Sequence, residues 1–450
     1  MKKKVLVLLA GAMMLAAPAL AAEIPIVGVE APAYNCDFEP SCEVSPGVYG
    51  KMASPVKSKF NLSIGGFVRL DYAYNSQNLG TLGFLLPGGG LNRSGSVADQ
   101  QDQSIFTARV SRFWLKVAGP TFLGAKTGAL IESDFVGLTA NQGNSNENGE
   151  LRMRHAMATI DWTNTQVMFG QFWDIFGPAA ASTVDFRQGA SFGTPNNPRV
   201  AQLRVTQKVN FNADNSLKLV LGLQNPSQDA TNGVGGNVPN VAGQIMFVSK
   251  ALGVGPGFYG MSLNSLQAGF FGLWGNQSGL NRSSDVYGYG AYAFVPLLKS
   301  SDGKSRAMTA SLETQAYIAS GMNWNGATAA NLAGPAGRPA AKGYGVYGQL
   351  IFYPIQDLGI TAGYERRNGM NYRALSASNV AASVGPPAVA AFNFEEYNEL
   401  IYANVAYDLN AAVRVSAEYL HAKTQYNAPI GATADSGQMN AVRVAAYYFF

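Results

Sequence analysis

Apolar and polar side chains alternate at every second position through much of this chain. In the segment NAVRVAAYYFF, Val442, Val444 and Tyr448 share one face, whereas Arg443 and Tyr447 share the other. A repeat of two residues indicates a β-strand with one apolar face. The pattern therefore predicts an all-β fold whose strands separate an apolar environment from a polar one.

About sixteen segments of this kind follow one another along the chain. A soluble β-sandwich would also alternate, but these segments are about ten residues long, as a tilted strand in a bilayer requires. A sheet in lipid cannot leave an edge unpaired, so its first and last strands must meet. We therefore expect a transmembrane antiparallel β-barrel of about sixteen strands. The strands are expected to begin near residues 60, 105, 123, 150, 165, 199, 217, 240, 264, 285, 305, 342, 358, 396, 412 and 439.

The connections between these segments alternate between short and long. TNT, NADNS, KSSDGK and IQ are tight turns, whereas the stretches after residues 75 and 368 are long. Outer-membrane barrels have short periplasmic turns and long outer loops, so both ends of the barrel are expected on the periplasmic side. The stretch ALGVGPGFYGMS does not fit this rule well and makes the eighth and ninth strands harder to place.

The chain begins with the features of a targeting segment. Lys2, Lys3 and Lys4 precede an apolar run that ends in an A-x-A motif, which predicts a cleaved secretory signal peptide over residues 1–22. The alternative is an uncleaved membrane anchor, because the run is nearly long enough to span a bilayer. Without these lysines the net charge falls from +4 to +1, so there is no electrostatic reason to expect a nucleic-acid partner.

Residues 23–58 are Pro-rich and aperiodic, and we expect them to form a periplasmic leader before a barrel over residues 59–450. The leader contains Cys36 and Cys42. In an oxidising compartment such a pair most simply forms a small disulfide loop. Two thiols supply too few ligands for a metal site, so no metal is expected.

A barrel of sixteen strands leaves a water-filled lumen, and the polar strand faces should line it. An arginine or lysine facing lipid would cost about 2–4 kcal/mol near the bilayer midplane. The charged candidates for the pore lining are Arg69, Asp71, Arg112, Lys116, Arg204, Lys208, Arg414, Glu418 and Arg443. A mild anion preference follows only if the bases outnumber the nearby acids, which are Asp71, Glu132, Asp134, Glu365 and Glu418.

The sequence offers little support for catalysis or for a cofactor. His155 and His421 are the histidines of the chain, and neither lies in a catalytic motif. GYGVYG, residues 343–348, matches a dinucleotide-binding motif by letter, but it lies within an alternating strand. Glycines there are expected to let strands or loops pack closely. We therefore expect no enzyme activity and no cofactor.

The stretch LRMRHAMATIDWTNTQVMFGQFWDIFGP, followed by NNPRVAQLRV and combined with the signal peptide and strand rhythm, resembles Gram-negative outer-membrane porins. It is similar in particular to major porins of metal-reducing bacteria. The resemblance implies a homotrimer in outer-membrane lipid, passive diffusion, and a last strand read by the barrel-assembly machinery through Val444, Tyr448 and Phe450. The cysteine-bearing leader departs from the general porin pattern.

The resemblance also implies a role for the stretch from Asp174 to Pro198, the third outer loop. In sixteen-stranded porins this loop folds inward and narrows the channel, which makes Asp174, Asp185 and Arg187 candidate selectivity residues. Charges of both signs across a pore would favour small polar solutes. An ordinary surface loop is the alternative.

These features predict a channel for passive diffusion of small hydrophilic solutes and ions. Two alternatives remain open at this point. One is a substrate-specific channel, and the other is a structural or interaction barrel whose outer loops support surface or electron-carrier partners. Single-channel conductance would separate an open pore from a closed scaffold.

Overall fold

The computed structural model describes most of the chain from residue 50 onward. Among the described residues, no helix combines the length and apolarity needed to cross a bilayer. The described residues are 50–51, 60–80, 83–85, 90–137, 149–184, 192–195, 198–226, 235–258, 262–279, 282–322, 327–328, 340–370, 395–427 and 433–450.

The signal peptide expected over 1–22 and the cysteine pair, Cys36 and Cys42, lie outside the described residues. The leader expected over 23–58 contributes the two-residue strand β1 (Gly50–Lys51), which pairs with the start of β2. The cleavage and the disulfide therefore stay predictions.

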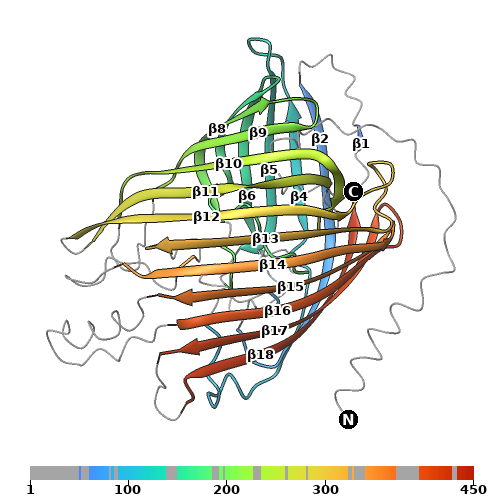
Figure 1. The fold of residues 1–450 in the computed structure, drawn as a ribbon. Coiled ribbons are helices and arrows are strands. Elements are labelled where there is room, and N and C mark those ends of the chain that lie inside the picture. The colour runs from blue at the N-terminus through green and yellow to red at the C-terminus, as the bar shows by residue number, and fades with distance from the viewer. Residues whose placement is uncertain are drawn as a thin grey trace.

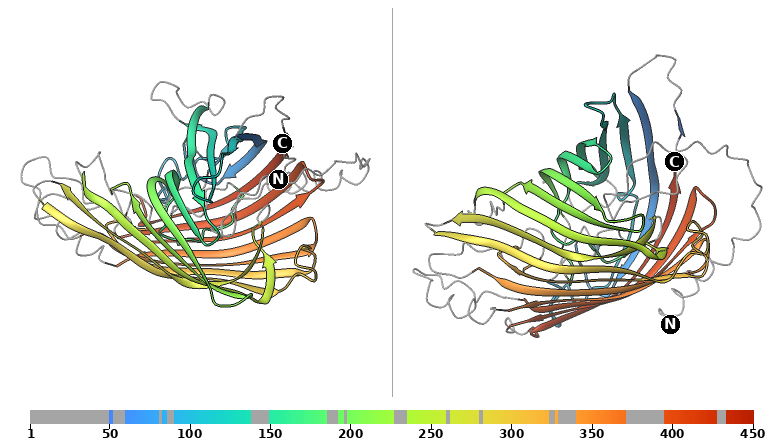
Figure 2. Two further views of the ribbon diagram at one scale, coloured as in Figure 1. Left: turned by 90° about the horizontal axis from the view of Figure 1, so that it is seen from above. Right: turned by 45° about the horizontal axis from the view of Figure 1, so that its top comes forward.

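The strands form one antiparallel sheet that closes on itself, because β18 (Ser436–Phe449) pairs with β2 (Asn61–Asn75). β3 (Gln103–Thr107) and β4 (Arg112–Ala118) pair with successive parts of β2, so they occupy one position in the barrel. β1 occupies no position of its own, because it only pairs beside β2. The eighteen strands therefore fill sixteen positions around the barrel. Figures 1 and 2 show them curving around a common axis. The prediction of a sixteen-stranded antiparallel barrel is confirmed.

The other strands follow in sequence order around the barrel, each antiparallel to the next. Most expected starting points fall close to observed ones, and the larger offsets are residue 305 against Thr309 and residue 240 against Gly235. These strands are β5 (Lys126–Gly137), β6 (Glu150–Asp161), β7 (Thr165–Trp173), β8 (Arg199–Asn210), β9 (Asn215–Gln224), β10 (Gly235–Pro256), β11 (Leu263–Gly279), β12 (Arg282–Leu298), β13 (Thr309–Ser320), β14 (Lys342–Ile355), β15 (Leu358–Gly369), β16 (Glu395–Asp408) and β17 (Val413–Tyr426).

The alternation in the sequence corresponds to the two faces of the barrel wall. In β18, Tyr448 is 56% exposed on the outer face, whereas its neighbour Tyr447 is 2% exposed inside. In β8, Leu203 and Val205 are exposed outside while Arg204 is buried inside. The outer face is therefore apolar enough for lipid contact, and the arginines are kept away from it.

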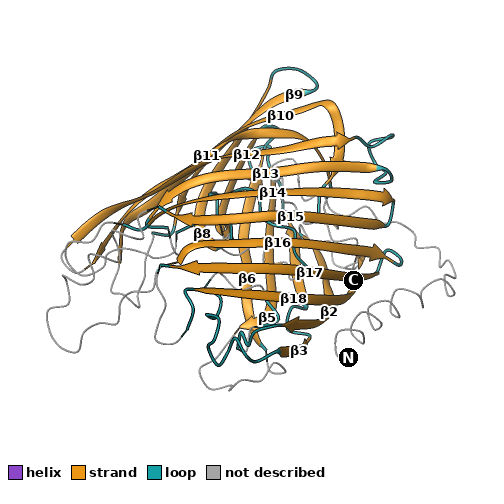
Figure 3. Ribbon diagram, turned by 60° about the horizontal axis from the view of Figure 1, so that its bottom comes forward, coloured by secondary structure: helices purple, strands orange, loops and turns teal. Residues whose placement is uncertain are grey.

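The two ends of the barrel differ in their connections, as Figure 3 shows. One end, called here the short-turn end, carries tight turns such as 162–164 and 356–357. Phe449 lies at this end, where its backbone N–H donates to the carbonyl of Ala412 at 2.7 Å. The other end, the long-loop end, carries most of the long connections. The ambiguous stretch after Ser249 lies at the short-turn end, where a register shift bends β10 before it reaches β11.

The turn between β12 and β13 shows how KSSDGK reverses the chain. The Asp302 carboxylate accepts hydrogen bonds from the backbone N–H of Ser305 (2.6 Å) and Lys304 (2.8 Å). Gly303 adopts a φ of 74°, a conformation that glycine reaches without steric cost. The two backbone hydrogen bonds, from Ser305 first and then Lys304, hold the pKa of Asp302 below its usual range.

Candidate functional site

The connection between β7 and β8 comprises residues 174–198 and is called loop 3 here. Its described residues, 174–184 and 192–195, fold into the barrel. Ile175, Phe176 and Phe192 of this loop are fully buried. Phe176 packs edge-on against Phe271 of β11, with the ring centroids 5.0 Å apart. The described part of loop 3 therefore lies inside the lumen, as the resemblance to porins implied.

Loop 3 crosses the lumen and is hydrogen-bonded to the opposite wall. The backbone N–H of Ala179 donates to Gln315 Oε1 in β13 (3.0 Å), and that of Ser182 donates to Gln349 Oε1 in β14 (3.0 Å). Further along, the N–H of Val184 donates to the Glu418 carboxylate in β17 (2.8 Å). Successive loop residues thus bond to strands progressively further around the barrel.

Two glutamates of this wall hold the loop, Glu365 directly and Glu313 through neighbouring side chains. The Glu365 carboxylate accepts hydrogen bonds from Thr194, through its backbone N–H (2.9 Å) and its hydroxyl (3.0 Å). The Glu313 carboxylate accepts hydrogen bonds from the Tyr347 hydroxyl (2.8 Å) and the Gln349 amide (2.7 Å), and the same Gln349 binds Ser182. Much of the negative charge on this wall is therefore engaged in holding loop 3.

The glycines of GYGVYG allow this close approach. A Cβ atom on Gly345 would lie 2.4 Å from the carbonyl oxygen of Gly193 in loop 3 and 2.3 Å from the Tyr317 ring. Such distances are far inside van der Waals contact. The prediction that glycines here permit close packing is confirmed, and the neighbour is the inward-folded loop.

The other part of the lumen wall carries a series of buried arginines from β17, β18, β2, β4, β6 and β8. Each is at most 6% exposed, and together we call them the arginine band. The arginine band consists of Arg69, Arg112, Arg154, Arg204, Arg414 and Arg443.

The arginines of the band are interleaved with aromatic rings. Tyr447 in β18 lies directly opposite Arg414 of β17 and Arg69 of β2. The Arg69 guanidinium carbon lies 4.8 Å from the centroid of the Tyr447 ring, within the range of a cation–π interaction. Arg69 Nε also donates to the Asp71 carboxylate at 2.8 Å. Ring and carboxylate together fix this guanidinium in place.

Two acidic residues of β5, Glu132 and Asp134, lie between the arginines of β4 and those of β6. Arg154 forms ion pairs with Glu132 and, at 3.0 Å, with Asp134. Asp134 also pairs with Arg152 at 2.6 Å. Arg112 lies 3.7 Å from Glu132. The local charge therefore remains positive, because three arginines share two carboxylates.

The arginines of β6 were missed among the charged pore candidates from sequence. Arg152 and Arg154 both reach Asp134, although Met153 between them is exposed. A register shift opposite Glu132 and Ser133 falls at Arg154, and Arg154 and His155 are both buried in succession. The available signal was the RMR triplet itself, in which two arginines share one strand face.

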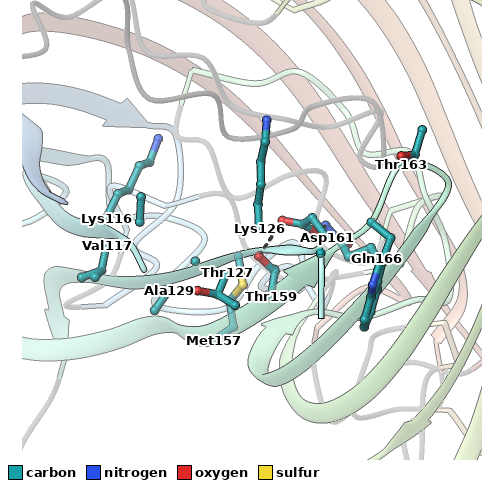
Figure 4. A pocket seen from close by; sticks show the side chains of 14 residues that line it. Lys116, Val117, Lys126, Thr127, Ala129, Met157, Thr159, Asp161, Thr163 and Gln166 are labelled. Carbon is teal, nitrogen blue, oxygen red and sulfur yellow. Dashed lines mark hydrogen bonds between the residues drawn. The ribbon is translucent and has the colours of Figure 1, made fainter. Parts of the chain in front are cut away.

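Two other charges predicted from the sequence, Lys116 and Lys208, lie outside the arginine band. Lys116 lines a recess of about 520 Å³ at the short-turn end together with Lys126 and Asp161. Figure 4 shows Lys126 close to Asp161 and Lys116 further away, beside Val117. The Asp161 carboxylate accepts hydrogen bonds from Thr159 (2.9 Å) and Gln166 (2.7 Å). This recess is separate from loop 3. Lys116 is therefore not part of the arginine band.

Loop 3 contains one described candidate for selectivity. Asp174 is 5% exposed, and its carboxylate accepts a hydrogen bond from the backbone N–H of Phe176 at 3.1 Å. Asp185 and Arg187 lie outside the described residues. The geometry assigns Asp174 a part in the turn where loop 3 leaves β7.

The residues expected to form the assembly signal lie on the outer face at the closure of the barrel. Val444 and Tyr448 point outward from β18. Phe450 continues the pairing, since its backbone N–H donates to the carbonyl of Gly66 (3.0 Å) and its carbonyl accepts from the Gly66 N–H (2.9 Å). Their recognition during assembly stays a prediction.

No protein-family model and no curated protein sequence matches the chain. Among solved structures it is similar to the outer membrane channel DcaP of Acinetobacter baumannii, with 19% identity and a TM-score of 0.62 over 88% of this chain and 99% of that one. It is also similar to the anion-selective porin from Comamonas acidovorans, with 10% identity and a TM-score of 0.53 over 87% of this chain and 100% of that one.

The chain has the porin fold. At these identities the likeness concerns the course of the backbone. The chemistry of the lumen depends on its own side chains, above all on those of loop 3 and the arginine band.

Proposed function

We propose that this chain is an outer-membrane porin that lets small hydrophilic solutes and ions diffuse down their gradients, without catalysing a reaction. The observation that carries the proposal is loop 3, which crosses the lumen and is hydrogen-bonded to Gln315, Gln349 and Glu418 on the far wall. A loop held across the lumen in this way narrows the aqueous path for solutes.

The charges favour anions as the preferred ions. The arginine band supplies six guanidinium groups. Glu365 in β15 accepts hydrogen bonds from loop 3, and Glu418 in β17 accepts one from loop 3 and also lies 3.7 Å from Arg443 of the band. Fixed positive charge along one wall lowers the energy of an anion in the lumen. The anion-selective porin from Comamonas acidovorans, which shares the fold, supports this reading.

Export by a cleaved signal peptide, insertion by the barrel-assembly machinery and assembly into homotrimers complete the proposal. The apolar outer face, with residues such as Leu203 and Tyr448 exposed, supports contact with outer-membrane lipid. Porins of this architecture place the short-turn end in the periplasm. Heat-modifiable migration and trimer bands on a gel test these points.

Single-channel recording of the refolded full chain in a planar bilayer tests the central claim. We expect ohmic steps in simple salt and a reversal potential displaced toward the anion in a salt gradient. Saturable block by one solute would favour a substrate-specific channel instead. A folded barrel without conductance would contradict the porin and favour a structural or interaction role.

A further inference from the structure

The outer face of the barrel changes from apolar to charged on the neighbouring strands β15, β16 and β17, which lie side by side in Figure 1. On β15, exposed Ile360 and Tyr364 are followed toward the long-loop end by Arg366 on the same face. On β17, exposed Tyr419 is followed in the same direction by Lys423. Aromatic residues at the edge of an apolar band mark the membrane interface. The two basic side chains therefore lie at the level of the lipid headgroups.

The strand register places these charged side chains in one row. Arg366 lies directly opposite Glu399 of β16, and Glu399 lies directly opposite Lys423. The chain neighbours Glu365 and Thr424 are fully buried on the inner face, whereas the Arg366 side chain is 34% exposed. Successive side chains of a strand point to opposite faces. The row therefore faces outward, at the end of the apolar band.

The ring of Tyr397 in β16 brings the two basic side chains together. The guanidinium carbon of Arg366 lies 4.1 Å from the ring centroid, and the ammonium nitrogen of Lys423 lies 5.5 Å from it. Both distances are within the range of a cation–π interaction. Arg366 Nε also donates to Asn368 Oδ1 at 2.8 Å, which fixes the orientation of the guanidinium. We call Arg366, Tyr397 and Lys423 the outer basic patch.

Acidic side chains balance the charge of the outer basic patch only in part. Glu399 Oε2 accepts hydrogen bonds from the Tyr364 hydroxyl (2.9 Å) and from Arg366 (3.1 Å). Its bonds thus go to β15 and not across the row to Lys423. Glu396 falls in the bulge at the start of β16, out of this row. Among the described residues of the row, one carboxylate accompanies two cations, which leaves a net positive charge.

The surroundings of the patch indicate a ligand that is both apolar and anionic. Ile401, two residues before the row on the outer face of β16, is 50% exposed and lies opposite Tyr364. Acyl chains packed on this apolar surface would place their headgroup beside Arg366 and Lys423. Guanidinium and ammonium groups both bind phosphate, and basic residues at a membrane surface attract anionic lipids. Free phosphate would use only the charged half of this surface.

We propose that the outer basic patch binds the phosphate group of an anionic lipid in the outer leaflet, with the acyl chains of the lipid on the adjoining apolar face. The site lies on the outside of the barrel wall and uses no residue of loop 3 or of the arginine band. Its assignment to the outer leaflet rests on the proposed function, because that function sets which end of the barrel faces outward. The binding of the lipid does not depend on it.

Native mass spectrometry of the refolded full chain in detergent tests the proposal with lipid A, a phosphorylated glycolipid. We expect lipid A adducts, and we expect Arg366→Gln and Lys423→Gln each to weaken binding about fivefold, the effect of one basic residue at a lipid surface. Lys304→Gln, which removes an exposed lysine in the turn between β12 and β13, is the matched control and should bind as the unmodified chain does. Absence of adducts, or equal weakening in the control, would overturn the proposal.

Two further ligands separate lipid recognition from simpler explanations. Dephosphorylated lipid A should bind more weakly than lipid A, and equal binding would mean that the acyl chains alone are recognised, which would overturn the proposal. Inorganic phosphate at the same concentration as lipid A should not displace it. Displacement would assign the patch to free phosphate and would reject the lipid.

A second copy of the chain is the other occupant that the experiment must distinguish. Each variant should migrate as a folded barrel on an unheated gel, which confirms folding, and should keep the oligomer bands of the unmodified chain. Loss of these bands from a folded variant would identify the patch as a subunit interface and would overturn the lipid proposal.

Conductance distinguishes this proposal from the porin assignment. Ohmic channels without lipid A binding would reject the lipid site and keep the porin. Lipid A binding without channels would reject the porin and keep the lipid site.

Discussion

At the scale of single residues, Tyr447 shows how the lumen is organised. It lies between Arg414 and Arg69 of the arginine band, and its hydroxyl donates to the carbonyl of Val184 in loop 3 at 3.3 Å. One side chain therefore contacts both parts of the proposed selectivity region. The inward position of Tyr447 follows from the alternation in the sequence, but its contact with a residue far away along the chain does not.

Replacing an arginine of the band should change ion selectivity. In Arg204→Gln the lumen loses a positive charge that lies 5.3 Å from the Phe172 ring. A unit charge at about 4 Å in water contributes about 1 kcal/mol, so the anion-to-cation permeability ratio should fall by roughly fivefold at most. Reversal potentials in a salt gradient measure the ratio, with Lys304→Gln as the control at an exposed turn. An unchanged reversal potential would show that the arginine band does not set the field.

Removing a loop-binding carboxylate should loosen loop 3. Glu365→Ala deletes the acceptor for the backbone N–H and the hydroxyl of Thr194. An orphaned buried donor costs about 1–3 kcal/mol, which should appear as increased open-channel noise in single-channel recordings. Asp357→Ala, in an exposed turn, is the matched control. Identical noise in both variants would contradict the anchoring role.

At the scale of elements, the strands were predictable because each carries its own alternation and is bounded by turn residues. The interruptions within the strands could not be predicted from this alternation. The break between β3 and β4 depends on pairing with successive parts of β2, and the register shift opposite Glu132 depends on β5 meeting β6. The inward path of loop 3 came from the resemblance to porins. Its partners, such as Gln315 for Ala179, are far apart in sequence and carry no local signal.

The close packing of loop 3 against β14 gives a prediction at this scale. Gly345→Ala would place a methyl group 2.4 Å from the Gly193 carbonyl oxygen, and overpacking of this kind costs about 1–3 kcal/mol. Gly348→Ala in the same strand meets its nearest atoms only at 3.9 Å. We therefore expect a lower unfolding temperature on heated gels and altered conductance for the first variant but not for the second. Equal behaviour of the two would place loop 3 away from Gly345.

At the scale of the whole molecule, the partition between inside and outside determines every functional statement. A spin label at Val415 on the outer face should be accessible to oxygen dissolved in the bilayer. A label at Lys116, which lines the recess at the short-turn end, should be accessible to a water-soluble nickel chelate. The reverse result would mean that the barrel is inside out, and the pore assignment would fail with it.

The hydrogen bonds between Phe450 and Gly66 also govern when this barrel can form. The two residues lie at opposite ends of the barrel sequence, so ring closure is the contact of greatest sequence separation and therefore the slowest to reach by chance. Until β18 has been synthesised, exported and delivered, β2 presents an unsatisfied edge to any neighbouring chain. A polypeptide interrupted before this strand would consequently remain an aggregation-prone open sheet.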